Sequence, residues 1–406
     1  MSRESEADLP GEPLLPGALP EALRAELVAF RRDLHMHPEL GNQEFRTTAA
    51  IKARLERAGL EPRVLSIGTG LICDIGDPDD VRPMLALRAD IDALPIPDTK
   101  SDCAYRSTVP DRAHACGHDI HTAVVLGAGL VLADLHAQGL LPRRVRLIFQ
   151  PAEEVLPGGA PDAIESGVLE GVGRIVGVHC DPRVDAGRIG LRHGAITSAC
   201  DRLEVSLDGA GGHTARPHLT TDLVTAAARV VTDVPALVAR RVDARSGLAV
   251  TWGRIESGHA CNVIPQHAEL SGTIRCLDLD AWRAAPDLVH AAIDEIANLY
   301  RAKSEINYIR GVPPVVNDGA VTDLLRDAMT ARRGAHSIED TEQSLGGEDF
   351  SWYLEHVPGA MARLGVRPPG DRTIRDLHRG DFDADEYAIT VGVEMFTAAA
   401  LLDERD

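Results

Sequence analysis

The sequence predicts an α/β protein whose main domain, built on a mixed β-sheet, is interrupted by an inserted second domain. Two observations carry this prediction. In the first half of the chain, short apolar runs typical of strands alternate with longer segments whose apolar residues recur at helical spacing. In the middle, the order of elements changes to β-α-β-β-α-β, the ferredoxin-like split unit, and polar clusters at strand ends resume only after it.

The first half begins with two predicted helices. Apolar residues recur at helical spacing over residues 21–37, and Pro38 ends this helix. A second helix covers residues 45–58 and stops at Gly59. Farther on, an apolar, alanine-rich stretch predicts a buried helix over residues 122–138. Short apolar runs predict strands over residues 70–75, 84–88, 145–149 and 175–179.

The middle of the chain is predicted to form an antiparallel sheet with two helices on one face. Its strands are expected over residues 203–207, 248–255, 268–275 and 304–311, and its helices over residues 221–242 and 281–301. We therefore expect a disordered tail over residues 1–20, a discontinuous main domain of residues 21–194 and 315–406, and an inserted domain of residues 195–314.

Composition narrows the class of protein. The chain has 62 acidic and 42 basic residues, a formal charge of -20, and no basic cluster beyond short pairs, which argues against nucleic acid as a partner. The N-terminal stretch has no apolar run of signal-peptide length, and no later run approaches the roughly 18 residues of a membrane span. The 7 cysteines are widely spread and include no Cys-x-x-Cys pair. We expect a soluble cytoplasmic protein without a membrane partner.

The stretch 114–122 places a thiol, three imidazoles and a carboxylate within a few residues. Cys116 and His118 are two positions apart, which puts their side chains on the same side of an extended or tightly turned segment, and Gly117 lets the backbone bend. The predicted helix begins just after them, and a helix N-terminus favours a thiolate over a thiol. Two donors could therefore meet one metal ion.

Other polar clusters follow predicted strands, where open α/β sheets bind their ligands. The candidate donors are Cys116, His118, one of Glu153 and Glu154, His179 and His378. Thiolate, imidazole and carboxylate together suit borderline divalent ions, and five donors suit two ions, which hydrolases hold about 3.5–4 Å apart to acidify a water. Adjacent glutamates point oppositely on an extended backbone, so one can be a ligand and the other a general base.

Two other classes of function compete with this interpretation. Cys116 could be the nucleophile of a cysteine amidase, with His118 or His121 as its base, but the paired glutamates and His378 would then have no role. A non-catalytic metal-binding protein would have no use for a free glutamate base. Motifs of zinc proteases, serine hydrolases and P-loop proteins are absent from the sequence.

Eight short runs, taken in order along nearly the whole chain, resemble one family. They are LHMHPE (34–39), LRADIDALP (87–95), HACGHDIH (114–121), FQPAEE (149–154), GHTARPH (212–218), NVIP (262–265), GTIR (272–275) and GGEDF (346–350). As a set they resemble the metal-dependent amidohydrolases that include hippurate hydrolase and the plant indole-acetyl-amino acid hydrolases, within the larger aminoacylase and carboxypeptidase group.

The resemblance implies a zinc-peptidase-like catalytic domain that binds two divalent ions, which could be zinc, manganese, nickel or cobalt. In that family's pattern the ions are held by Cys116 as the bridge with His118, Glu154, His179 and His378, and Asp90 lies beside them. Glu153 would be the general base.

The resemblance also implies that the inserted domain is a lid or dimerisation module of a homodimer or homotetramer. His213 would stabilise the oxyanion, reaching in from a partner subunit, and Asn262 and Arg275 would bind the substrate carboxylate. The expected substrate is an N-acyl amino acid or a similar small amide. The sequence departs from the family at residues 158–162, where a proline and an acid replace residues that are often apolar, and this leaves the size and polarity of the substrate open.

Overall fold

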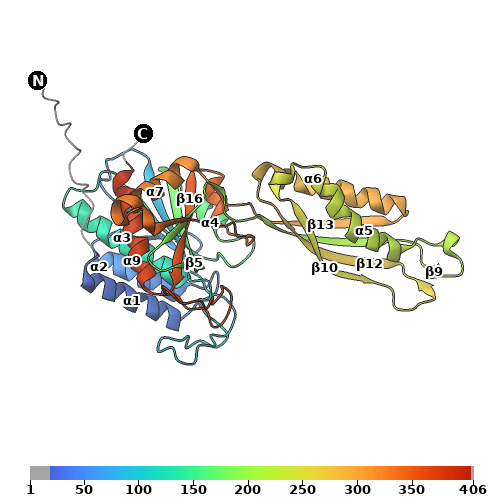
Figure 1. Cartoon of the computed structure of the whole chain (residues 1–406), viewed down its shortest axis with the longest axis horizontal. Helices are drawn as coiled ribbons and strands as arrows, with labels where there is room; N and C mark the ends of the chain where they lie inside the picture. Colours follow the sequence, from blue (N-terminus) through green and yellow to red (C-terminus); the bar gives the residue numbers. More distant parts are fainter. Residues whose placement is uncertain (1–18, 404–406) are drawn as a thin grey trace, which may run out of the picture.

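The structure, a computed structural model, describes residues 19–403. It has a layered α/β part and an elongated part formed by the middle of the chain, joined by a narrow connection (Figure 1). The predicted disordered tail lies outside the described residues except for Leu19 and Pro20. Leu19 packs against the main core, and Pro20 immediately precedes the first helix.

An eight-stranded mixed sheet forms the centre of the α/β part, with the order β1-β2-β4-β3-β5-β16-β6-β15. The strands are β1 (Arg63–Val64), β2 (Leu71–Ile75), β3 (Met84–Asp90), β4 (Val145–Gln150), β5 (Val172–Asp185), β6 (Ile189–Leu191), β15 (Ile338–Asp340) and β16 (Gly359–Arg367). The neighbours β4, β3, β5 and β16 pair in parallel, whereas β2 pairs antiparallel with β4 and β6 with β16. The carboxyl ends of the four parallel strands therefore meet at one edge of the sheet.

Helices cover both faces of this sheet. One hydrophobic core joins it to α1 (Glu21–Met36), α2 (Phe45–Arg57), α3 (His118–Ala137), α7 (Gly319–Arg333) and α9 (Tyr387–Leu402). A smaller core on the other face includes residues of α4 (Ala160–Glu165) and α8 (Ser351–Leu354). Burial on both faces explains why β3 and β4 read as continuous apolar runs with no alternation.

Helix α3 is the central helix of the main core. It begins at His118, four residues earlier than residue 122, because the segment turns at Gly117, whose φ is 87°. By length and composition α3 could cross a membrane, so the expectation that no apolar run approaches that length was wrong. In the fold, 72% of its most apolar window is buried, as expected for a helix that is apolar on all sides.

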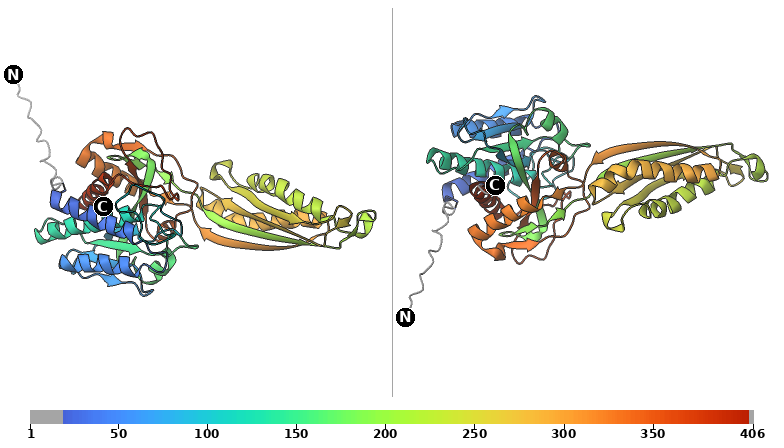
Figure 2. Two further views of the ribbon diagram at one scale, coloured as in Figure 1. Left: turned by 90° about the horizontal axis from the view of Figure 1, so that it is seen from below. Right: turned by 90° about the horizontal axis from the view of Figure 1, so that it is seen from above.

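The middle of the chain forms a separate four-stranded antiparallel sheet with the order β10-β12-β8-β13. Its elements are β8 (Cys200–Asp208), α5 (Leu223–Ala239), β10 (Ala249–Ser257), β12 (His267–Arg275), α6 (Leu279–Leu299) and β13 (Lys303–Val312). Both helices pack on the sheet through a core of their own. In both views of Figure 2 this part projects away from the α/β part.

The two parts meet where the chain passes between them. There β7 (Gly194–Ala195) pairs with β14 (Val316–Asn317). Trp282 of α6 packs edge to face on Trp352 of α8, with ring centroids 6.0 Å apart. The predicted domain boundaries stay predictions, although the sheets change close to them.

The α/β fold class is confirmed, and most predicted elements agree with the structure within a few residues. Strand β5 is the main exception. It was expected to end at residue 179, where polar residues begin, but it runs on to Asp185 because it continues to pair with β16. His179 therefore lies within β5 and not past its end.

Candidate metal centre

Six side chains that the sequence singled out lie together at the edge where the parallel strands end. They are Cys116 and His118 at the start of α3, Glu153 and Glu154 just after β4, His179 on β5, and His378 in the loop between β16 and α9. The loop that carries His378 is fixed to the stretch before α3, since the backbone N–H of His378 donates to the carbonyl oxygen of Ala115 at 2.8 Å.

The donor atoms of these residues form two groups that share one sulfur. Sγ of Cys116 lies 3.4 Å from Nε2 of His179, and Oε1 of Glu154 lies 3.8 Å from Nε2 of His118 and 3.4 Å from Nε2 of His378. Within each group, the donor atoms lie within 4.8 Å of one another; the groups are Cys116–His118–His179 and Cys116–Glu154–His378. This geometry suits two cations that share the Cys116 sulfur.

The two adjacent glutamates face different neighbours. Glu154 lies between His118 and His378, in the middle of the donor atoms. Glu153 groups with Glu348 and Asp349 on one side and with His118 and Glu154 on the other, and its Oε2 lies 4.0 Å from Nε2 of His118. Glu154 is thus the better placed of the two to bind a cation shared with Cys116 and His378.

The site concentrates negative charge. Burial, together with the carboxylates of Glu154 and Glu153, raises the pKa of the Cys116 thiol well above its ordinary value. Burial and the charges of Glu348 and Glu154 likewise raise the pKa of Glu153. For Glu154, burial is outweighed by the nearby imidazoles of His378 and His118, which lower its pKa. The partial positive charge at the helix N-terminus does not offset these effects. The thiol of Cys116 would therefore need a bound cation to become a thiolate.

The residues present fit divalent cations. Nε2 of His118 and Oε1 of Glu154 are buried and have no hydrogen-bond partner in the described part of the chain, although both face the other donors. Buried polar atoms are almost always satisfied, so two orphaned donors in one cluster indicate missing ligands. Thiolate, imidazole and carboxylate are the donors that zinc, manganese, nickel and cobalt accept.

Comparison with known proteins decides the family. Residues 86–402 match the profile of Peptidase family M20/M25/M40. The chain belongs to this family. It is therefore a hydrolytic enzyme, and the resemblance seen in the sequence is confirmed.

Three similar proteins show how far the M20 likeness extends. A Rhodococcus jostii protein named "Putative glutamate–cysteine ligase 2-3" is 46% identical over 380 residues; the match spans 94% of this chain but only 47% of that protein, about half its length. N-acetyl-L-cysteine deacetylase of Bacillus subtilis is 38% identical over 367 residues, 90% of this chain and 85% of the relative. The crystal structure of Bacillus subtilis YXEP protein, titled a dinuclear metal binding peptidase from M20 family, is 35% identical, with a TM-score of 0.81 over 94% of this chain and 98% of that chain.

Asp92 positions two of the candidate donors of this M20 site. Asp92 accepts hydrogen bonds from Nδ1 of His118, at 2.9 Å to its carbonyl and 3.2 Å to Oδ1, and from the backbone N–H of Glu154 at 2.9 Å. Asp90, predicted to lie beside the ions, accepts from Nδ1 of His121 at 2.6 Å. Sequence reasoning gave Asp92 no individual role and considered His121 only as a possible base of a cysteine amidase. The LRADIDALP run held the only signal, a second aspartate two positions after Asp90.

A second charged cluster lies behind Glu153. The guanidinium of Arg88 is fully buried and contacts Asp90 at 2.7 Å, Asp349 at 2.8 Å and Glu348 at 3.3 Å. Burial by itself lowers the pKa of Arg88. The neighbouring carboxylates outweigh this effect and raise the pKa well above its ordinary value. The GGEDF run had marked Glu348 and Asp349 only as part of the family pattern, and the structure shows them against the M20 site.

Three predicted site residues are not brought to the donors within one chain. His213 is exposed on β9 (Gly212–His213), which pairs with β11 (Val263–Ile264) at the far end of the inserted part (Figure 1). Asn262 is exposed at the same end, whereas Arg275 is at the opposite end of β12, near the α/β part, and donates to the carbonyl oxygen of Leu345 at 3.0 Å. Asn262 and Arg275 therefore cannot hold one carboxylate within a single chain.

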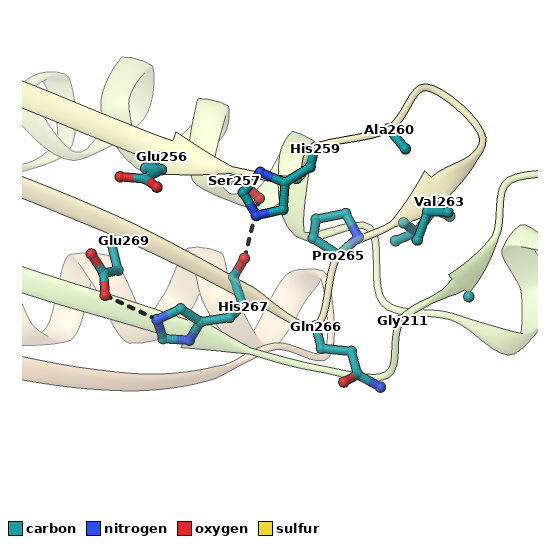
Figure 3. Close-up of a pocket in the computed structure, with 13 residues that line it drawn as sticks. Gly211, Glu256, Ser257, His259, Ala260, Val263, Pro265, Gln266, His267 and Glu269 are labelled. Carbon is teal, nitrogen blue, oxygen red and sulfur yellow. Dashed lines mark hydrogen bonds and ion pairs between the residues drawn. The ribbon is translucent and has the colours of Figure 1, made fainter.

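The end that carries His213 also has a hollow. Its volume is about 650 Å³, and it is lined by Gly212, His259, Val263 and His267, among others (Figure 3). His267 contacts Asp208 at 2.9 Å and Glu269 at 3.3 Å, but these residues are exposed and contribute to none of the donor groups. This hollow is not the metal centre of the M20 enzyme.

Gly117→Ala tests how tightly the start of α3 is built. A Cβ at this position would lie 2.6 Å from Sγ of Cys180, and φ is 87°, so we expect a loss of about 2–4 kcal/mol in the free energy of unfolding and weaker metal binding. Gly139→Ala is the matched control, since φ is 72° there and nothing lies within 4 Å of the added Cβ. Denaturant unfolding should show a loss of only about 1–2 kcal/mol for the control. Equal losses for the two variants would contradict the close packing against Cys180.

Proposed function

We propose that this M20 enzyme hydrolyses the amide bond of N-acyl amino acids or similar small amides. The position of Glu153 carries the proposal: a carboxylate whose side chain is only 9% exposed lies beside the donor groups of Cys116 but outside both of them. A centre that only stored metal would need no such group. The relative named N-acetyl-L-cysteine deacetylase supports an acyl amino acid as the substrate.

In the proposed reaction, Cys116, His118, Glu154, His179 and His378 hold two divalent ions. When bound, such ions polarise the substrate carbonyl and acidify a water molecule. Glu153 accepts the proton of the attacking water and then gives it to the nitrogen of the departing amine. Glu348 and Asp349, behind Glu153, disfavour a further negative charge, which helps Glu153 to hold that proton between the two steps.

The inserted part is proposed to supply the remaining groups as a lid and dimerisation domain. His213 lies far from the donors of its own chain, so it would stabilise the oxyanion only in a partner subunit of a homodimer or homotetramer. Asn262, at the same end, would act in the same partner site. Arg275 remains a candidate for the substrate carboxylate in its own chain.

A substrate screen tests the proposed activity. Enzyme reconstituted separately with zinc, manganese, nickel and cobalt should release free amine from N-acetyl-L-cysteine, N-acetyl-L-alanine or N-benzoylglycine, and metal analysis should find two ions per subunit. Release of amine can be followed with an amine-reactive dye. Dipeptides with a free N-terminus serve as the comparison. Turnover of dipeptides without turnover of any acyl amino acid would contradict the proposal.

A further inference from the structure

The described part of the chain buries four arginines, and three of them are held by carboxylates. The pairs are Arg31 with Asp119 at 2.7 Å, Arg88 with Asp90 at 2.7 Å, and Arg146 with Asp74 at 2.6 Å. Arg363 is the fourth. It is 5% exposed, its Nη2 is buried without a hydrogen-bond partner, and no described carboxylate lies within ion-pair distance of it.

An unpaired buried guanidinium is unfavourable, because the charge loses its hydration without gaining a counterion. Burial lowers the pKa of Arg363, and the more distant carboxylates of Asp181 and Glu348 offset this only in part. A guanidinium nevertheless stays protonated in proteins, so the side chain cannot escape the cost by losing its proton. A buried, protonated guanidinium without a counterion therefore indicates a binding site for an anion that the protein itself does not supply.

Arg363 lies next to the metal centre. On β16 it is the partner of His179 in the parallel pairing with β5, so the two side chains share one face of the sheet. On its other side it is paired with Gly190 of β6, where a Cβ would lie 3.2 Å from the Cβ of Arg363 and 2.8 Å from that of Thr341. The missing side chain at Gly190 therefore makes room for the first carbon of the Arg363 side chain and for Thr341.

The guanidinium has space in front of it. Arg363 lines a cavity of about 140 Å³ together with Asp181, Thr341, Gln343 and Ser344. This volume corresponds to about four or five water molecules, enough for a carboxylate with a small substituent. The residue after Ser344 is Leu345, whose carbonyl oxygen already accepts a hydrogen bond from Arg275. Of these two arginines, Arg275 uses one donor in this way, whereas Nη2 of Arg363 is buried without a partner.

We propose that Arg363 binds the carboxylate of the acyl amino acid, on the His179 side of the metal centre. The proposal rests on the function proposed above and gives the catalytic domain a carboxylate site of its own. A planar guanidinium can donate two parallel hydrogen bonds to a carboxylate, which a carboxamide cannot accept in the same way. Acidic residues also line the cavity, among them Asp181 and Glu342, so a ligand with one carboxylate is favoured over a diacid.

Binding of a matched pair of ligands tests this proposal without relying on turnover. The metal-loaded Glu153→Gln enzyme is titrated calorimetrically with N-acetyl-L-alanine and with N-acetyl-L-alaninamide, before and after adding Arg363→Met. We expect Arg363→Met to weaken binding of the acid about 10- to 100-fold and to leave binding of the amide nearly unchanged. Arg363→Lys should retain part of the preference for the acid.

Two controls separate binding from structure. Arg245→Gln alters an exposed arginine of the inserted part that does not line this cavity, and it should change neither affinity. Because Arg363 is unpaired, Arg363→Met should leave Tm unchanged or raise it, and a fall of more than about 5 °C would show a structural role. Equal weakening of acid and amide, or an acid-specific loss in Arg275→Gln but not in Arg363→Met, would overturn the proposal.

Failure of the proposed function has a different signature. If the Glu153→Gln enzyme binds neither ligand and the unmodified enzyme cleaves no acyl amino acid, the proposed function fails and this proposal fails with it. If the unmodified enzyme cleaves N-acetyl-L-alanine while Arg363→Met retains its affinity for the acid, only the role of Arg363 is wrong.

Discussion

Glu153→Gln is expected to lower kcat by about 10²- to 10⁴-fold while the enzyme keeps both metal ions. The amide has nearly the size of the carboxylate, so the packing against Glu348 and Asp349 should survive. It cannot take a proton from water, however, and it cannot return one to the departing amine. Because Glu153 lies outside both groups of donor atoms that contain Cys116, its charge is not required to hold those ions. Steady-state kinetics and metal analysis on the same preparation measure the two effects.

The neighbouring residue provides the matched control. Glu154 differs from Glu153 by one position and lies 3.4 Å from His378 and 3.8 Å from His118. Glu154→Gln should therefore lose metal as well as activity. The roles would be wrong if Glu153→Gln lost metal and Glu154→Gln did not, and a Glu153→Gln enzyme that turned over acyl amino acids at the parental rate would remove the general base altogether.

The fold and the donor set were accessible from the sequence because both depend on local patterns. Buried parallel strands give uninterrupted apolar runs, as at β3 and β4, and an α/β sheet brings their carboxyl ends to one edge. Glu154 closely follows such a run at the end of β4, whereas Cys116 at the start of α3 and His378 in the loop after β16 reach the same edge through the fold. The number of donors alone indicated two ions.

Other features of the site could not be predicted from the sequence, because they depend on how the strands pair or on a second chain. A strand pattern gives no register, so nothing in the run around Arg363 showed that it would lie beside His179 with Gly190 opposite. Nothing in the sequence showed that Nδ1 of His121 would donate to Asp90, at 2.6 Å in the fold. The places of His213 and Asn262 came from family resemblance, and within one chain the fold holds both far from the donors.

Cys116→Ser should reduce the metal content below two ions per subunit and lower the affinity for the remaining ion. A serine hydroxyl loses its proton far less readily than a thiol, so it cannot supply the shared anionic donor on which both groups depend. We expect a loss of affinity at least as large as the roughly 10- to 100-fold loss that follows removal of a residue supporting a ligand. Titration of the metal-free protein with zinc measures both the number of sites and their affinity.

The same variant separates a metal hydrolase from a cysteine amidase. Sγ of Cys116 contacts Nε2 of His179 at 3.4 Å, as a nucleophile and its base would, but burial and Glu154 raise the pKa of the thiol and so oppose a free thiolate. Cys180→Ser is the control, because Cys180 lies on β5, is buried against Gly117 and belongs to none of the donor groups; this variant should keep both ions. Exhaustive chelation should abolish activity and added metal should restore it. An inactive Cys116→Ser enzyme with two ions still bound, or a parent enzyme that works after chelation, would make Cys116 the nucleophile.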